Sequence, residues 1–343
     1  MLRNDLRDVY ENRSHSYGRQ VMFSQHGFHG HPSRLFLVLL TLLAIGCGSE
    51  GDTRVVDFTK TIAVAPSEHA PAEGSVLRVA IAAMVSPRET FHQHRQVLDY
   101  IGTRLGKQIE LIQRKTYREV SDLFTKGEID LAFVCSGPYA TGKEKYGFEL
   151  LATPEIQGTH FYQAYLIVNK ESAYRNLEDL RGRIFAFTDP DSNTGRLVPV
   201  YWLAARSVRP ETFFARTIYT YSHDNSILAV ARGLVDGAAV DGLVWEYYNR
   251  KNPTFTSSTR IIRKSDPYGM PPLVASRYLP EELKGRIRQV LIKMHREPEG
   301  RDILKELMID RFVVPDERWY DTIRRMERTV ASLSGDPHAP AKP

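Results

Sequence analysis

Hydroxyl and amide side chains crowd the stretch TDPDSNTGRLVP at residues 188–199. Ser192, Asn193 and Thr194 follow an expected strand and open an expected helix, where backbone N–H groups are free and the helix dipole is positive. These side chains can donate further hydrogen bonds to an anion, and Gly195 allows the backbone to approach closely. The same residue types also serve as plain helix N-caps. The composition therefore leaves both an anion site and a simple cap open.

Similar residues stand at two further expected strand ends. YSHDNS at residues 221–226 contains His223, which could donate to an oxyanion because its side chain titrates near neutrality. FVCSGPY at residues 133–139 adds Ser136 and the Gly137 amide. A single histidine in a loop is also often structural. If these turns face the same cleft as the first stretch, they surround one anion with donors.

The expected strands and helices alternate in a way that would bring these turns together. Residues 76–139 read as strand, helix, strand, helix, strand, and residues 161–241 repeat that plan. This order predicts mostly parallel sheets covered by helices. Two such α/β lobes joined by two crossings make a cleft, and ligands bind beyond the carboxyl ends of the strands. We expect lobe 1 at residues 76–168, lobe 2 at 169–265, and a return crossing with C-terminal helices packing on lobe 1 at 266–343.

The amino end is expected to be a targeting segment. RLFLVLLTLLAIGC runs from Arg34 through an apolar core of about a dozen residues to the small Gly46 and then Cys47. This pattern is typical of a secretory signal, and it is too short to span a bilayer comfortably. A cysteine directly after the small residue resembles a bacterial lipobox. We therefore predict a signal over residues 1–46 and lipidation of Cys47.

Two points about this segment stay open. A plain signal peptide and an uncleaved anchor are the alternatives to a lipoprotein, and Met22 is an alternative start to Met1. Residues 47–75 read as a tether rich in small and polar residues. We expect the protein in the periplasm or cell envelope, anchored to the membrane by lipid.

The composition argues against other classes of protein. The net charge of the 343 residues is +5, and residues 1–47 hold five basic and three acidic residues, so the rest carries +3, too little and too dispersed for nucleic acid. No Walker, H-E-x-x-H or CxxC pattern occurs, so neither a metal nor another cofactor is expected. Ser192, His223 and Asp241 could form a triad, and Cys135 with His223 a thiol dyad. Because no nucleophile-elbow signature accompanies them, we predict a binding protein and not an enzyme.

The order of several segments resembles a known family. TYREV, GEIDLAFVCSGPY, FYQAYLIVNKES, DPDSNTGRLVP, SHDNSILAVARGLVDGAAVD and PPLVASRYL together resemble the phosphate/phosphite/phosphonate-binding proteins of ABC importers. The resemblance covers about Val76 to Val330 and is strongest in the fourth and fifth segments. It implies a type II periplasmic-binding fold and capture of a small phosphorus oxyanion for an ABC permease. We expect the binding protein to be a monomer.

The resemblance also implies roles for individual residues. Family members hold the oxyanion with a hydroxyl triplet and a histidine while two tyrosines close the pocket, and the matching residues are Ser192, Asn193, Thr194, His223, Tyr117 and Tyr162. Asn193 replaces the usual middle hydroxyl, and Asp241 falls beside the pocket. Members that bind aminoalkyl phosphonates hold the ammonium with carboxylates, at positions occupied here by Leu243 and Pro271. Because an unpaired buried ammonium is costly, phosphate, phosphite or a simple phosphonate fits better.

Cys135 supports a rival interpretation. A relative of this family senses arsenite for a histidine-kinase system through one thiol in its pocket, and a thiolate is the soft ligand that such chemistry needs. Cys135 ends an expected strand that faces the cleft. An unpaired cysteine is also commonly a small buried hydrophobe. The alternative function is therefore an oxyanion sensor that feeds a histidine kinase.

Overall fold

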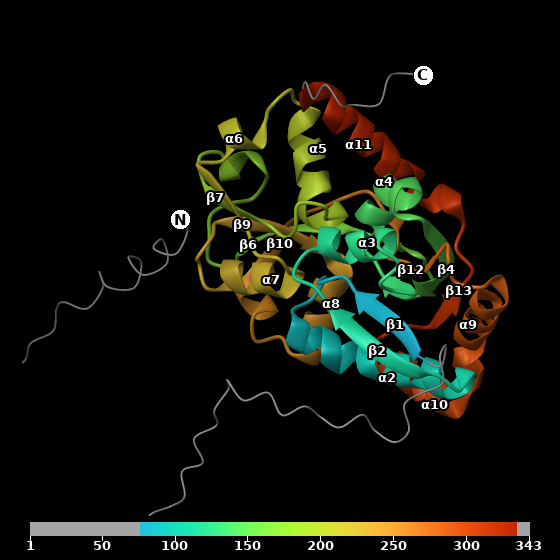
Figure 1. The fold of residues 1–343 in the computed structure, drawn as a ribbon. Helices are drawn as coiled ribbons and strands as arrows, with labels where there is room; N and C mark the ends of the chain where they lie inside the picture. The colour runs from blue at the N-terminus through green and yellow to red at the C-terminus, as the bar shows by residue number, and fades with distance from the viewer. Residues whose placement is uncertain (1–75, 335–343) are drawn as a thin grey trace, which may run out of the picture. The chain divides into compact units, whose positions relative to one another are not determined.

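The computed structural model describes the backbone of residues 76–334, and the side chains of this range except those of residues 87–93 and 333–334 (Figure 1). The predicted signal, the lipidation of Cys47 and the tether lie outside the described residues. Within the described range, no helix has both the length and the apolar character needed to cross a membrane.

Lobe 1 is built on a mixed sheet of six described strands, in the order β13-β4-β12-β3-β1-β2. β1 pairs in parallel with β2 and β3, whereas β12, β4 and β13 join the sheet in antiparallel pairs. The strands are β1 (Val76–Ile81), β2 (Gln108–Gln113), β3 (Leu131–Phe133), β4 (Phe148–Glu155), β12 (Leu273–Ser276) and β13 (Arg311–Val313).

Helices cover both faces of this sheet. In β1, Val79 and Ile81 pack in one apolar cluster with α2 and α9, while Ala80 packs in another with α3 and α4, as the two-residue period of a strand requires. α2 ends at Gly106, which takes a left-handed φ of 65°. The described helices are α2 (Pro87–Leu105), α3 (Tyr117–Thr125), α4 (Ser136–Tyr146), α9 (Glu281–Lys293), the 3₁₀ turn η4 (Met294–Arg296) and α10 (Pro298–Glu306).

Lobe 2 repeats the plan with a sheet of five described strands, in the order β10-β6-β9-β7-β8. β7 pairs in parallel with β8 and β9, and β6 and β10 close one edge in antiparallel pairs. The strands are β6 (Ala164–Asn169), β7 (Ile184–Phe187), β8 (Arg216–Tyr219), β9 (Gly237–Asp241) and β10 (Thr259–Lys264). The helical elements are η1 (Glu178–Leu180), η2 (Asn193–Leu197), α5 (Val198–Ala204), α6 (Pro210–Phe213), α7 (His223–Ala231), α8 (Gly242–Lys251) and η3 (Thr256–Ser258).

The chain crosses between the lobes on a two-stranded antiparallel ribbon, in which β5 (Phe161–Tyr162) pairs with β11 (Tyr268–Gly269). The predicted lobe boundary at residue 168 is wrong by one strand. Residues 161–170 do not form a single strand, because β5 belongs to the ribbon and β6 already pairs with β9 and β10 in lobe 2. Lobe 1 therefore ends before Ala164.

The C-terminal segment returns mainly to lobe 1, but its last helix contacts both lobes. α9 contacts β4, β13 and α2 of lobe 1. After the 3₁₀ turn η5 (Glu317–Tyr320), α11 (Asp321–Ser334) contacts both α4 of lobe 1 and α5 of lobe 2. This helix therefore packs across the two lobes.

Candidate functional site

Helices from both lobes begin where the strands end and the lobes meet. In lobe 1, α3 follows β2 and α4 follows β3; in lobe 2, η2 follows β7, α7 follows β8 and α8 follows β9. Each of these elements starts at the carboxyl end of its strand, the edge at which open α/β sheets bind ligands. Their first residues place the side chains of the site.

The backbones of the two lobes touch at Gly137. A Cβ atom on this residue of α4 would lie 2.7 Å from the carbonyl oxygen of Asp191 and 2.9 Å from the backbone nitrogen of Asn193, both in lobe 2. Only glycine permits this approach. The start of α4 therefore packs directly against the turn that begins η2.

Tyr162 joins the crossing ribbon to both lobes. Its hydroxyl lies 2.5 Å from Ser136 Oγ in lobe 1 and accepts a hydrogen bond of 3.2 Å from Asn193 Nδ2 in lobe 2. All three side chains are buried. Tyr162, one of the predicted pocket tyrosines, thus lies between Ser136 of lobe 1 and Asn193 of lobe 2, which were both predicted as donors.

His223 is held as a neutral hydrogen-bond donor. Its Nδ1 accepts the backbone N–H of Asp241 at 3.0 Å and lies 3.1 Å from Thr188 Oγ1. Because a backbone N–H can only donate, the proton of the neutral ring lies on Nε2. Burial lowers the pKa of His223 to about 3, so the ring stays uncharged near neutral pH. Its Nε2–H is directed toward lobe 1, where the Tyr117 hydroxyl is 3.5 Å away.

Three buried polar atoms at this interface between the lobes have no hydrogen-bond partner within the described residues. They are Asn193 Oδ1, Thr194 Oγ1 and Ser222 Oγ, on side chains no more than 1% exposed. Leaving such a group unsatisfied costs about 1–3 kcal/mol, and native proteins seldom do so without a reason. A half-turn of the Asn193 amide would let Tyr162 donate to Oδ1 and would free the NH₂ group as a donor. These atoms are suited to hydrogen bonds with a ligand.

Ser192 serves as a helix N-cap, which is the simpler of the two roles, anion site or cap, that the sequence left open. Its Oγ accepts the backbone N–H of Gly195 at 3.0 Å, which makes Ser192 the N-cap of η2. A Cβ at Gly195 would lie 2.5 Å from Cβ of Thr188, so this turn requires glycine. The cap uses an oxygen lone pair of Ser192 and leaves its hydroxyl proton available for donation.

The carboxylates of the site hold loops in place. Asp241 Oδ1 accepts the backbone N–H of Leu243 at 2.7 Å and caps α8, while burial raises the pKa of Asp241 to about 7. Asp189 accepts the backbone N–H of Tyr117 across the interface between the lobes at 3.1 Å, and burial raises its pKa too. Asp189 therefore ties the start of α3 to lobe 2.

Cys135 lies in the same region but is poorly suited to ionise. Its side chain is 2% exposed and packs with Ala82 and Tyr117. Burial raises the pKa of the thiol to about 11, although hydrogen bonds from the backbone N–H groups of Asn193 and Gly137 oppose the shift. Near neutral pH Cys135 is a thiol, not a thiolate.

We call the set of residues at this interface the polar cluster; its members are Tyr117, Cys135, Ser136, Tyr162, Ser192, Asn193, Thr194, Ser222, His223 and Asp241. No member is a lysine or arginine. Its neutral donors come from both lobes and from the crossing. Such a set can replace the hydration shell of a bound anion without a compensating cation.

The sequence matches the model of one protein family over residues 79–320, described as the periplasmic substrate-binding protein of ABC phosphonate transporters. The chain belongs to this family. Its members are substrate-binding proteins and not enzymes.

Curated members of the family are similar at low identity. The phosphonates-binding periplasmic protein of Escherichia coli is 25% identical over 73% of this chain and 75% of its own length. A probable phosphite-binding ABC transporter protein of Prochlorococcus marinus is 25% identical over 52% of this chain and 62% of its own. A phosphate-import protein of Mycolicibacterium smegmatis is 29% identical over 47% of this chain and 54% of its own.

Solved structures of family members share the fold. The binding component of a Pseudomonas aeruginosa ABC phosphonate transporter superposes with a TM-score of 0.71 and 25% identity, covering 76% of this chain and 89% of that one. A Prochlorococcus marinus protein in complex with methylphosphonate gives a TM-score of 0.68 at 20% identity, covering 75% and 99%. The type II periplasmic-binding fold expected from the sequence is therefore confirmed.

The structure brings the predicted site residues of this family member together. Each one among the described residues is buried in the polar cluster, and hydrogen bonds link Ser136 to Tyr162 to Asn193, and Tyr117 to His223 to Asp241. Sequence reasoning missed Thr188, which contacts the His223 ring. It opens the quoted stretch, but nothing in its spacing indicated that contact.

Proposed function

We propose that the chain captures phosphate, phosphite or a simple phosphonate between its lobes and presents the closed form to an ABC permease. The observation that supports this most directly is the set of buried, unpartnered polar atoms on Asn193, Thr194 and Ser222 beside the neutral donor His223. The two hydroxyls can donate to an anion, and so can the Asn193 NH₂ group once its amide is turned by half. A tetrahedral oxyanion has acceptors in several directions, and hydrogen bonds to a charged group are strong. By contacting both lobes, the ligand would stabilise the closed state.

Thr194→Val tests this proposal, because it removes the hydroxyl and keeps the side-chain shape. Affinity for phosphate, phosphite or methylphosphonate, whichever binds best, should fall about 10- to 150-fold, since a hydrogen bond to a charged group contributes about 1.5–3 kcal/mol. The stability of the free protein should not fall, because the lost hydroxyl has no partner among the described residues. Titration calorimetry and urea unfolding measure the two quantities.

Thr153→Val is the matched control. Thr153 is also fully buried, but its Oγ1 lies 3.2 Å from the Tyr320 hydroxyl, within lobe 1. This variant should lose about 1 kcal/mol of unfolding free energy and keep its affinity. If Thr194→Val binds as tightly as the parent protein, the polar cluster is not the anion site.

We also propose that the protein acts as a monomer held at the membrane through lipid on Cys47. The support is the signal-like segment that precedes this residue. Cys47→Ala should shift the protein from the membrane fraction to the soluble fraction and abolish labelling by a fatty-acid analogue. Unchanged fractionation and labelling would reject the anchor.

The sensor alternative is less well supported. Arsenic binds the thiolate form of cysteine, and Cys135 has a raised pKa of about 11. Two of the curated relatives named above are described as an ABC transporter binding protein and a phosphate-import protein. Calorimetry with arsenite separates the two ideas: binding of arsenite alone, lost in Cys135→Ser, would favour the sensor.

A further inference from the structure

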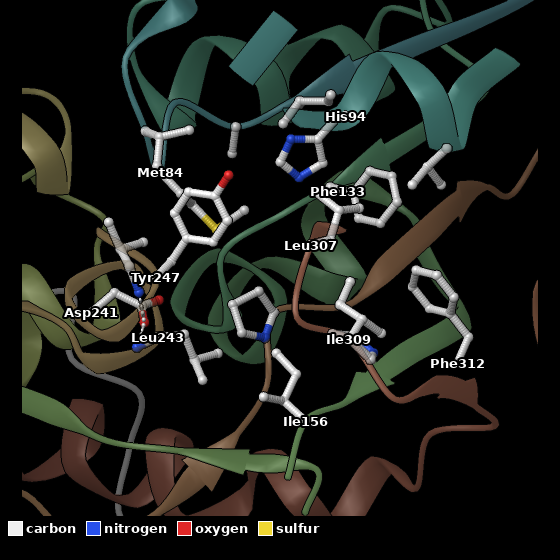
Figure 2. Close-up of a pocket in the computed structure, with 17 residues that line it drawn as sticks. Met84, His94, Phe133, Ile156, Asp241, Leu243, Tyr247, Leu307, Ile309 and Phe312 are labelled. Carbon is white, nitrogen blue, oxygen red and sulfur yellow. Dashed lines mark hydrogen bonds between the residues drawn. The ribbon is translucent and has the colours of Figure 1, made fainter. Parts of the chain in front are cut away.

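An apolar cavity of about 150 Å³ adjoins the polar cluster (Figure 2). Met84 and Asp241 connect the cavity to the polar cluster. The Met84 carbonyl accepts the backbone N–H of His223 at 2.9 Å, and the Asp241 backbone N–H donates to the His223 ring, while the side chains of Met84 and Asp241 line the cavity. The cavity therefore begins where the anion donors end.

The walls of the cavity come from both lobes and are mainly aliphatic and aromatic. In Figure 2, Met84, Tyr247 and Leu243 lie on one side of it, and Phe133 and Ile309 lie on the other. Among the described residues that line it, no lysine or arginine occurs and Asp241 is the one carboxylate. An apolar cavity of this size can hold a guest as large as benzene. Its chemistry suits a hydrocarbon group and not a charged one.

The residues at positions 243 and 271 also favour a hydrocarbon group over a charged one. Leu243 and Pro271, which stand where the sequence analysis placed the ammonium-binding carboxylates of other family members, both line the cavity. The remaining carboxylate, Asp241, already accepts the backbone N–H groups of Leu243 and Val244 through Oδ1. An ammonium group in this cavity would lose its hydration shell, and its one carboxylate partner, Asp241, is already partly used by these backbone hydrogen bonds.

We propose that the apolar cavity holds the uncharged substituent of an organophosphonate whose oxyanion lies in the polar cluster. The preferred ligand is then an alkyl or aryl phosphonate of up to about six carbons, a limit set by the benzene-sized guest that such a volume accepts. This inference rests on the proposed function, because the oxyanion must first be bound by the cluster.

A series of ligands with one head group and different tails tests the inference. Calorimetry on the purified protein compares phosphite with methyl-, ethyl-, propyl-, phenyl- and 2-aminoethylphosphonate. Affinity should rise about fourfold for each added methylene from methyl to propyl. The 2-aminoethyl ligand has nearly the shape of the propyl ligand, and it should bind at least about tenfold more weakly. Equal affinity from methyl to propyl, or stronger binding of the 2-aminoethyl ligand, overturns the inference.

Substitutions at two positions test whether the tail lies in this cavity. Leu243→Glu should reverse the preference, so that 2-aminoethylphosphonate binds more tightly than propylphosphonate, whereas Leu243→Met should keep the parent preference. Ile309→Trp should fill the cavity and reduce propyl- and phenylphosphonate to the affinity of methylphosphonate or below. Phosphite has no tail, so its affinity should be unchanged in Ile309→Trp.

The outcomes separate this inference from the proposed function. If phosphite and methylphosphonate bind but longer tails give no gain, the cavity is not a tail site, while the function stands. If Ile309→Trp leaves the gain intact, the tail lies elsewhere and the inference is wrong. If no phosphorus oxyanion binds, the proposed function fails and takes this inference with it.

Discussion

His223 and Asp241 are buried, hydrogen-bonded neighbours whose pKa values shift in ways that offset each other. Burial lowers the pKa of His223 from 6.5 to about 3 and raises that of Asp241 from 3.8 to about 7. Between about pH 4 and 6.5, the unfolded chain carries a proton on the histidine, whereas the folded protein carries one on the aspartate. The number of bound protons is the same in both states. The two contributions to the pH dependence of stability therefore cancel.

Removing either His223 or Asp241 should reveal the contribution of the other residue to the pH dependence of stability. In Asp241→Asn, the lowered histidine pKa remains, so stability should be lost as pH falls from about 6.5, by about 1.4 kcal/mol per pH unit relative to the parent protein. In His223→Asn, the raised aspartate pKa remains, so stability should be lost as pH rises from about 4 toward 7, with the same slope. Urea unfolding at pH 4.5, 5.5 and 6.5 measures both.

The substitutions preserve the local hydrogen bonds. An asparagine at 241 still offers an oxygen to the Leu243 N–H, and one at 223 still offers an oxygen to the backbone N–H of residue 241. Slopes of the same sign in the two variants, relative to the parent protein, would contradict the opposed pKa shifts.

At this scale the sequence indicated which side chains gather but not how each is used. Hydroxyls and amides after strands were sufficient to predict the neighbourhood of Asn193, Thr194 and His223. That Ser192 serves as the cap, and that Thr188 contacts the histidine ring, depends on side-chain directions set by contacts between separate strands. Such contacts leave no periodic trace in the sequence.

At the scale of elements, the proposed closure of the lobes requires the start of α4 to approach the turn before η2 closely. Gly137→Ala should hinder it, because the added Cβ would lie 2.7 Å from the Asp191 carbonyl oxygen. We expect each lobe to fold normally but affinity for methylphosphonate to fall at least about tenfold, since the ligand must then bind a closed state that is less populated. Small-angle scattering with ligand should show a larger radius of gyration than for the parent protein.

Gly285→Ala in α9 is the control for this substitution. No described atom outside the neighbouring backbone of its own helix lies within 4 Å of a Cβ built at Gly285, and alanine in a helix interior should add about 0.5–1 kcal/mol of stability. Its affinity and scattering profile should match the parent protein. A Gly137→Ala protein that binds and closes like the control would show that this contact does not limit closure.

The element order was predictable, but the antiparallel strands that complete each sheet were not. β1, β2, β3 and β7 to β9 follow from apolar runs with helices between them. β4 and β13 were not predicted, and β6 was placed in the wrong lobe, because antiparallel partners far apart in the chain are chosen by tertiary packing. Gln163 separates β5 from β6 without any turn residue to announce the break.

At the scale of the whole domain, hydrogen bonds and ion pairs far apart in sequence join the two lobes. Arg118 of lobe 1 makes a two-point ion pair with Asp191 of lobe 2, at 2.9 and 3.1 Å. The backbone N–H of Ser86 donates to Asp224 at 2.9 Å, and Lys115 lies 4.3 Å from the centre of the Tyr221 ring. These contacts favour the closed arrangement even before a ligand contributes.

Arg118→Met should therefore weaken ligand binding only modestly. An exposed ion pair contributes about 0.2–1 kcal/mol, so affinity for methylphosphonate should fall at most about fivefold, and the difference should shrink in high salt. Arg181→Met, which breaks an exposed pair within lobe 2, should leave affinity unchanged. A loss of a hundredfold would mean instead that Arg118 contacts the ligand.

The position of Tyr162 has a mechanical consequence. This residue is in β5, one of the two strands on which the chain passes between the lobes, and yet its hydroxyl reaches Ser136 and Asn193. If the lobes part by rotation about that ribbon, Tyr162 stays almost still while Arg118 travels along an arc. A ligand bound beside Tyr162 would then move only slightly when the lobes close. The outer edges of the lobes, where a permease could sense the change, would move much farther.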